Sequence, residues 1–245
     1  MVLALSSLKI KSFMILAIFT LLLFPVIYLN TNGSLTSPVN DSYGLFISLL
    51  TDSAGSRGFL ITLAVLCLMT LSLKLNKATL LRFTLALAFL LITSFATKSI
   101  LKHVTQQPRP YVEFLQQEHI IPDTDTFYRA ELLEKNLFIT EATNNTSTWR
   151  TRHWLGETNY SFPSGHTIFV AICIIFFGGI FAHYRCYAFI ALLLTWGLGV
   201  SYTRLWLGMH HPFDLLASTL CAALLFALMP TNAIQRWLVS KKLSK

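Results

Sequence analysis

Long apolar stretches alternate with shorter polar ones along the chain. A helix that spans a bilayer needs about 20 mostly apolar residues, and six stretches come close to that length. They cover approximately residues 12–29, 58–75, 80–101, 166–183, 187–204 and 213–229. The first is long for the apolar region of a signal peptide, and Leu29-Asn30-Thr31-Asn32 is a poor small-residue cleavage site, so we expect it to be retained. The pattern predicts an all-α, polytopic membrane protein with six transmembrane helices and both chain ends on one side.

The longest polar segment, at about residues 103–165, lies between the third and fourth apolar stretches. It is too polar to cross a membrane and too long for an unstructured loop, so we expect it to fold as a small helical cap. Asp123 or Thr124 is placed to cap a helix that continues to about residue 137. The expected organisation is one integral membrane domain over residues 1–245, with the cap on one membrane face.

Composition and charge agree with membrane insertion. Only 12% of the residues are charged, against roughly a quarter in soluble domains. The formal net charge is +8, but Lys and Arg lie at the ends of apolar runs and form no basic face for nucleic acid. Because Lys and Arg collect in cytoplasmic loops, we expect cytoplasmic ends at Lys9, Lys11, Lys74, Lys77, Arg82, Arg185, Arg236, Lys241, Lys242 and Lys245.

Several cations lie at the opposite ends of these stretches, where the topology does not require them. Lys102, Arg109 and Arg204 are the ones that stand beside a histidine or a predicted turn. A single cation in such a place is usually a side chain that snorkels to the interface, but that explanation does not fit all three together. Arginine suits bidentate contacts and lysine supplies a point charge. We therefore expect the three to bind a phosphoryl group and to stabilise its transition state.

Ser164, Gly165 and His166 come directly before an apolar run that predicts a helix. The first N–H groups of a helix have no intrahelical partner and attract anions. Gly165 lets the backbone approach an oxygen closely, and Ser164 adds a hydroxyl. The ordinary pKa of a histidine side chain lies near physiological pH, so His166 is the candidate general acid.

His210 and Asp214 are four residues apart, with Pro212 between them. Proline is tolerated in the first turn of a helix, so a helix that begins near His211 would leave His210 at its mouth and Asp214 in its first turn. A carboxylate that accepts a hydrogen bond from one ring nitrogen fixes the tautomer and leaves the other nitrogen as a lone pair. This spacing predicts that His210 is a nucleophile supported by Asp214.

Together, the three motifs resemble the signature of the type 2 phosphatidic acid phosphatase superfamily. They are Lys102-x6-Arg109-Pro110, Pro163-Ser164-Gly165-His166 and Ser201-x2-Arg204-x5-His210-x3-Asp214. The third motif usually begins Ser-Arg, whereas Tyr202 and Thr203 separate Ser201 from Arg204 here. The six apolar stretches, with a polar segment between the third and fourth, resemble bacterial lipid phosphatases of this superfamily over most of the chain.

The resemblance implies a lipid phosphatase that cleaves a phosphate monoester or diphosphate through a phosphohistidine, with no cofactor and no metal. His210 would attack, Asp214 would support it and His166 would protonate the leaving oxygen. The phosphoryl group would be held by Lys102, Arg109, Ser164, Gly165 and Arg204. The single carboxylate among the motifs is also too few for a two-metal site.

The same resemblance implies a bacterial inner-membrane protein whose active site faces the periplasm. Phosphatidylglycerophosphate and undecaprenyl diphosphate are both suitable substrates, because each places a phosphate at the membrane interface on an apolar tail. We expect a monomer surrounded by membrane lipids, with no nucleic-acid partner.

Three other classes of protein remain alternatives. A vanadate-dependent haloperoxidase has the same residues on a soluble helical scaffold, but six membrane-length stretches argue against it. A transporter would place charges along the spans, whereas these cations gather at one membrane face. An inactive lipid-binding relative is disfavoured because every position of the signature is filled.

Overall fold

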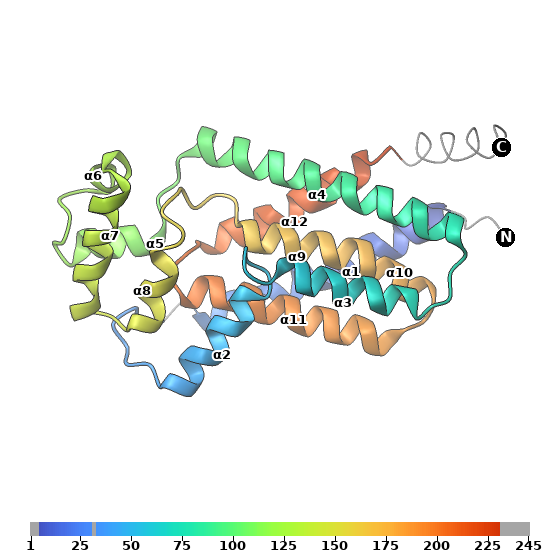
Figure 1. The fold of residues 1–245 in the computed structure, drawn as a ribbon, viewed down its shortest axis with the longest axis horizontal. Helices are drawn as coiled ribbons and strands as arrows, with labels where there is room; N and C mark the ends of the chain where they lie inside the picture. Colours follow the sequence, from blue (N-terminus) through green and yellow to red (C-terminus); the bar gives the residue numbers. More distant parts are fainter. Residues whose placement is uncertain (1–4, 31–32, 231–245) are drawn as a thin grey trace.

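The computed structural model describes residues 5–30 and 33–230, and every regular element in these ranges is helical (Figure 1). The all-α prediction is therefore confirmed for the described chain. The helices are α1 (Leu5–Asn30), α2 (Asp41–Asp52), α3 (Phe59–Leu71), α4 (Lys77–Thr105), α5 (Pro110–Gln117), α6 (Thr124–Arg129), α7 (Leu132–Glu141), α8 (Thr148–Trp154), α9 (Gly165–Cys173), α10 (Gly179–His183), α11 (Tyr187–Trp206) and α12 (Pro212–Leu228), with a 3-10 turn η1 at Ala142–Asn144 and a π-helical turn η2 at Ile174–Gly178.

The continuous helix formed by α9, η2 and α10 is the centre of the bundle. Its residues 167–181 are all buried, which fits a stretch that is apolar on every side. The surrounding helices include α1, α4, α11 and α12 (Figure 1). Gly179 lies so close to α1 that an added Cβ would overlap the hydroxyl of Ser12, as in other close helix contacts made by small residues. This packing fixes the central helix, and with it the position of Gly165 at its N-terminus.

Four helical segments are long and apolar enough to cross a membrane by length and composition: Leu8–Asn30, Lys77–Gln117, Gly165–His183 and Tyr187–Trp206. The other two predicted spans correspond to α3 and α12. These apolar helices have 13 and 17 residues, which is short for a perpendicular crossing of a hydrocarbon layer about 30 Å thick. Membrane-length helices are thus present, and the six-span topology stays a prediction.

Helices α5 to α8 gather at one end of the bundle (Figure 1). Tyr111 and Trp154 are buried there and stack with ring centroids 4.9 Å apart. Asp123 caps α6 by accepting the Thr126 N–H at 2.7 Å, as predicted. The single helix predicted to continue to about residue 137 is wrong, because extended backbone at Ala130 separates α6 from α7.

The first residues of α1 and the last residues of α12 lie away from α5–α8 (Figure 1). The same end of the bundle holds the start of α4 and the turn after α10, where several of the predicted cytoplasmic cations are found. Arg236, Lys241, Lys242 and Lys245 lie outside the described residues. The charge asymmetry predicted from the sequence therefore matches the two ends of the bundle, while the membrane side that each end faces stays a prediction.

Candidate active site

The three motifs meet where the membrane-length helices end beside α5–α8. The motif residues lie at helix ends: Lys102 in the last turn of α4, Arg109 before α5, Ser164 before α9 and Arg204 in the last turn of α11. A cavity of about 430 Å³ opens among them. It is lined by Lys102, Arg109, Gly165, His166 and His210, together with apolar side chains that include Phe59, Leu91, Phe95 and Phe169. Ser164, Arg204 and Asp214 are buried and do not line it.

Asp214 fixes the orientation of the His210 ring. His210 Nδ1 lies 3.2 Å from Asp214 Oδ2, and α12 begins at Pro212, as predicted. The same carboxylate oxygen accepts the His211 N–H at 2.9 Å and the Ser161 hydroxyl. An ionised carboxylate only accepts hydrogen bonds, so the proton of His210 belongs on Nδ1. His210 Nε2 therefore carries the lone pair.

The lone pair of His210 points toward a cation. Arg109 Nη1 lies 3.4 Å from His210 Nε2. Burial and then the charges of Arg109, Arg204 and Lys102 lower the pKa of His210 well below its ordinary value, because both effects disfavour the imidazolium. The ring is neutral at neutral pH, which is the form that a nucleophile requires.

The Arg109 guanidinium, which is 1% exposed, is held by several acceptors. Its Nε donates to the Asn159 carbonyl at 2.7 Å, Nη1 to the Met209 carbonyl at 2.9 Å and Nη2 to Asn159 Oδ1 at 2.7 Å. Lys102 Nζ donates to the carbonyls of Tyr160 and Ser161. The two cations therefore also hold the segment that leads into α9.

Ser164 is the N-cap of α9. Its hydroxyl accepts the Thr167 N–H at 3.3 Å, so the structure uses it to cap the helix, and its predicted contact with phosphate stays a prediction. Gly165 lines the cavity, and an added Cβ at this position would come within 2.9 Å of Lys98 Cδ. A larger residue there would displace Lys98 or push the start of α9 away from the cavity.

Glu157 is a residue that the motifs do not include, and it lies among their charges. Arg204 Nη2 donates to both of its carboxylate oxygens at 2.9 Å, and Arg109 Nη2 lies 3.3 Å from Oε2. His166 Nδ1 is 3.9 Å from Oε1. Burial alone would raise the pKa of Glu157, but the charges of Arg204, His166 and Arg109 outweigh it and lower the pKa. The Glu157 carboxylate thus contacts both Arg109 and Arg204, the two arginines that we expect to bind phosphate.

Sequence reasoning also missed three supporting residues. Asn159 holds Arg109, Ser161 holds Asp214, and Thr51 of α2 accepts a hydrogen bond from Arg204 Nη1 at 2.8 Å. Asn159 and Ser161 precede the Pro163–His166 motif closely, which is the only signal that marked them. Thr51 comes from a distant segment with no motif of its own.

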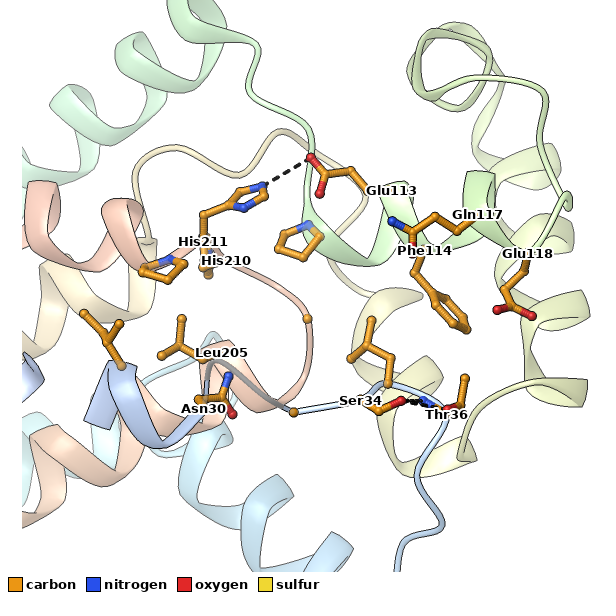
Figure 2. Close-up of a pocket in the computed structure, with 16 residues that line it drawn as sticks. Asn30, Ser34, Thr36, Glu113, Phe114, Gln117, Glu118, Leu205, His210 and His211 are labelled. Atoms are coloured by element: carbon orange, nitrogen blue, oxygen red, sulfur yellow. Dashed lines mark hydrogen bonds and ion pairs between the residues drawn. The ribbon is translucent and has the colours of Figure 1, made fainter. Parts of the chain in front are cut away.

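A second cavity, of about 650 Å³, is also lined by His210 (Figure 2). Glu113 and His211 both line it and are in contact, with Glu113 Oε1 3.5 Å from His211 Nε2, and Glu118 also lines it (Figure 2). None of the described residues that line this cavity is Lys or Arg. Because its carboxylates would repel a phosphate, the smaller cavity with the cations is the candidate active site.

Comparison with known proteins agrees with this geometry. The family model described as PAP2 superfamily matches residues 83–237, which include all three motifs. The chain belongs to the PAP2 superfamily. Helices α1, α2 and α3 precede the part of the chain that the superfamily model matches.

Curated relatives are similar over much of the chain. Phosphatidylglycerophosphatase B of Escherichia coli (strain K12) is 37% identical over 172 residues, which are 66% of this chain and 65% of that protein. The chain thus matches slightly less than two thirds of the length of this relative. Phosphatidylglycerophosphatase B of Haemophilus influenzae is 33% identical over 203 residues, which are 77% of this chain and 83% of that protein.

Proposed function

We propose that this chain is a membrane lipid phosphatase that transfers a phosphoryl group to His210 and then to water. The observation that carries the proposal is the neutral His210 ring, whose Nδ1 is held by Asp214 while Nε2 points toward Arg109 and the cation-lined cavity. Membership of the PAP2 superfamily and the relatives named phosphatidylglycerophosphatase B support the same activity.

In the proposed reaction, His210 Nε2 attacks phosphorus and the bond to the leaving oxygen breaks. Asp214 stabilises the positive charge that develops on the ring. His166, which takes up a proton when the anionic phosphoryl group binds beside it, donates that proton to the leaving oxygen. Lys102, Arg109 and Arg204 neutralise the equatorial oxygens. Water then attacks the phosphohistidine, His166 takes one of its protons, and the N–P bond breaks to release inorganic phosphate.

The position of Glu157 adds one step to this proposal. Its carboxylate contacts Arg204 and Arg109, so a phosphoryl group must displace it to reach both cations. Phosphate carries more negative charge than a carboxylate and forms bidentate contacts with arginine equally well. The exchange of one anion for another keeps the two buried arginines paired throughout.

Phosphatidylglycerophosphate is the proposed substrate, because the similar curated proteins are named for it. Undecaprenyl diphosphate is a second candidate, since the cavity combines cations with the apolar side chains of Phe59, Leu91 and Phe95, and either lipid offers a phosphate on an apolar tail. We propose that α3 and α12 also cross the membrane, giving six spans, and that α5–α8 and the site face the periplasm of a bacterium.

A panel of phosphorylated lipids, assayed with the purified protein in detergent, tests this function. Release of phosphate from phosphatidylglycerophosphate, with an acid-labile and base-stable phosphoprotein intermediate, is the expected result. His210→Ala should abolish both, whereas His183→Ala, at the other end of the central helix, should change neither. EDTA should have little effect. Failure to cleave any lipid phosphate would contradict the proposal, and halide oxidation by the vanadate-loaded protein would favour a haloperoxidase.

A further inference from the structure

We propose that Thr51 is a positioning residue for Arg204, holding one end of its guanidinium so that the other edge faces the phosphoryl group. This inference rests on the proposed function. It assigns a role to α2, which lies outside the part of the chain matched by the superfamily model.

The contacts of Arg204 divide its guanidinium into two ends. The side chain is fully buried. Nη1 donates to Thr51 Oγ1 at 2.8 Å, and Nη2 donates to both oxygens of Glu157. Among the described residues, Nε has no hydrogen-bond partner although it is buried.

This division matters because Nε and Nη2 lie on the same edge of a guanidinium, while Nη1 lies on the other side. On the edge that faces Glu157, Nη2 therefore donates to the carboxylate, whereas Nε has no acceptor among the described residues. A buried donor without an acceptor is unfavourable. A phosphoryl group in the place of Glu157 presents oxygens to both donors, as in bidentate arginine–phosphate pairs. The free Nε of Arg204 is thus matched to a ligand larger than the carboxylate.

Thr51 is suited to anchor Arg204 because its own position is fixed. It is 1% exposed and lies in the last turn of α2, which packs against α11 and α8. Ser48, one turn earlier, is hydrogen bonded to His153 at 3.0 Å. Ser53, just after α2, accepts from Trp196 Nε1 at 2.8 Å. The turn that carries Thr51 is therefore held on both sides.

Loss of the Thr51 hydroxyl would leave Nη1 without an acceptor. The guanidinium could then rotate about its terminal torsions to find another partner, and the Nε–Nη2 edge would turn away from the phosphoryl position. The effect would appear in phosphate binding and turnover, and not only in stability. A purely structural threonine would affect stability alone.

Three variants separate these roles. Thr51→Val keeps the shape and removes the acceptor, whereas Thr51→Ser keeps the hydroxyl. Thr70→Val makes the same substitution at a buried threonine in the last turn of α3, whose hydroxyl donates to the Leu66 carbonyl and does not contact Arg204. For each variant, we would measure lipid phosphatase kcat and KM, the binding of vanadate to the purified protein by calorimetry, and the thermal unfolding midpoint.

Thr51→Val is expected to weaken vanadate binding and lower kcat at least about tenfold, a smaller effect than loss of a direct transition-state donor. Thr51→Ser should restore both values, and Thr70→Val should leave both unchanged. If Thr51→Val does not accumulate in the membrane, Thr51→Cys, whose thiol is a weak acceptor, is expected to give the same result.

The inference is overturned if the Thr51 variant binds vanadate as tightly as the wild-type protein, or if Thr70→Val weakens binding equally. Vanadate binding is measured without turnover, so the two proposals can fail separately. A wild-type protein that neither cleaves lipid phosphates nor binds vanadate would contradict the proposed function and the inference together.

Discussion

At the scale of single residues, the charge on His210 decides whether it can act as a nucleophile. The ring is fixed by Asp214, which also accepts hydrogen bonds from Ser161 and the His211 N–H. Burial and the surrounding cations keep the ring neutral. The same cations that would bind the phosphoryl group thus also keep the nucleophile unprotonated before the substrate binds.

Removing Arg109 should therefore change the pH dependence as well as the rate. After burial, its charge is the largest cause of the lowered pKa of His210. In the Arg109→Gln variant that pKa should rise toward its ordinary value, so the acidic limb of kcat/KM, which reports the free enzyme, should move to higher pH. Turnover should also fall by about 10²- to 10³-fold, as for a lost oxyanion-hole donor.

The matched control for this variant is Arg129→Gln. Arg129 is an exposed arginine of α6 whose guanidinium lies 3.7 Å from Asp125, so its loss should leave both the rate and the pH profile unchanged. An acidic limb that stays in place in Arg109→Gln would show that burial alone sets the protonation of His210.

Glu157→Gln tests whether the carboxylate competes with phosphate. Glutamine keeps the shape but removes the charge, so vanadate should inhibit this variant at lower concentration than the wild-type protein. The unfolding midpoint should fall, because Arg204 and Arg109 lose their anionic partner and unpaired buried charges are unfavourable. Weaker inhibition by vanadate would instead mean that Glu157 positions the arginines for the substrate.

Each of the eight predicted site residues came from a motif, whereas Glu157 could not be recognised in this way. A single glutamate in a polar segment has no spacing that distinguishes it from a solvated one. Its role depends on two arginines that are 48 and 47 positions away in the sequence. Only the packing of α11 and of the segment before α5 brings these charges to the same carboxylate.

At the scale of elements, helix starts were predictable where the signal is local. Ser164 caps α9, and Pro212 opens α12 with Asp214 in its first turn. The break between α6 and α7 could not be predicted in this way, because the residues at the break, Ala130 and Glu131, are neither glycine nor proline. Packing decides it: Phe127 and Ile139 are both buried in the same cluster, and the chain must turn between them to place both inside.

The turn between α2 and α3 also contributes to the site, through Gly55. A Cβ at this position would lie 2.8 Å from His166 Nε2, which is too close for the ring to stay in place. Gly55→Ala should therefore lower turnover on lipid phosphates by displacing the general acid. A substrate with a good leaving group, such as an aryl phosphate, needs little protonation and should be affected less.

Arg57→Ala is the control, because Arg57 lies in the same turn and is exposed, with its guanidinium 3.4 Å from Asp52, and it does not line the cavity. This variant should keep its activity on both classes of substrate. If Gly55→Ala lowers the rates for lipid and aryl phosphates equally, the turn shapes the phosphate site itself and not the position of the acid.

At the scale of the whole molecule, apolar stretches located the helices well but did not establish how many of them cross the membrane. Four segments reach spanning length, whereas α3 has 13 residues. From hydropathy, the span was predicted to continue to about residue 75. In the structure, α3 ends at Leu71, and Lys74 has a positive φ of 52°. A window of apolar residues does not capture turn geometry of this kind.

Thiol labelling tests the proposed topology with a reporter at each end of the bundle. Glu134 lies on the exposed surface of α7, and Cys186 follows α10 at the opposite end. If α5–α8 face the periplasm, an impermeant thiol reagent should label Glu134→Cys in cells whose outer membrane alone is permeable. Cys186 should react only after the inner membrane is opened, and the wild-type protein gives the background for the native cysteines. Labelling in the reverse order would place the active site in the cytoplasm, where a lipid phosphate would have to reach it from the inner leaflet.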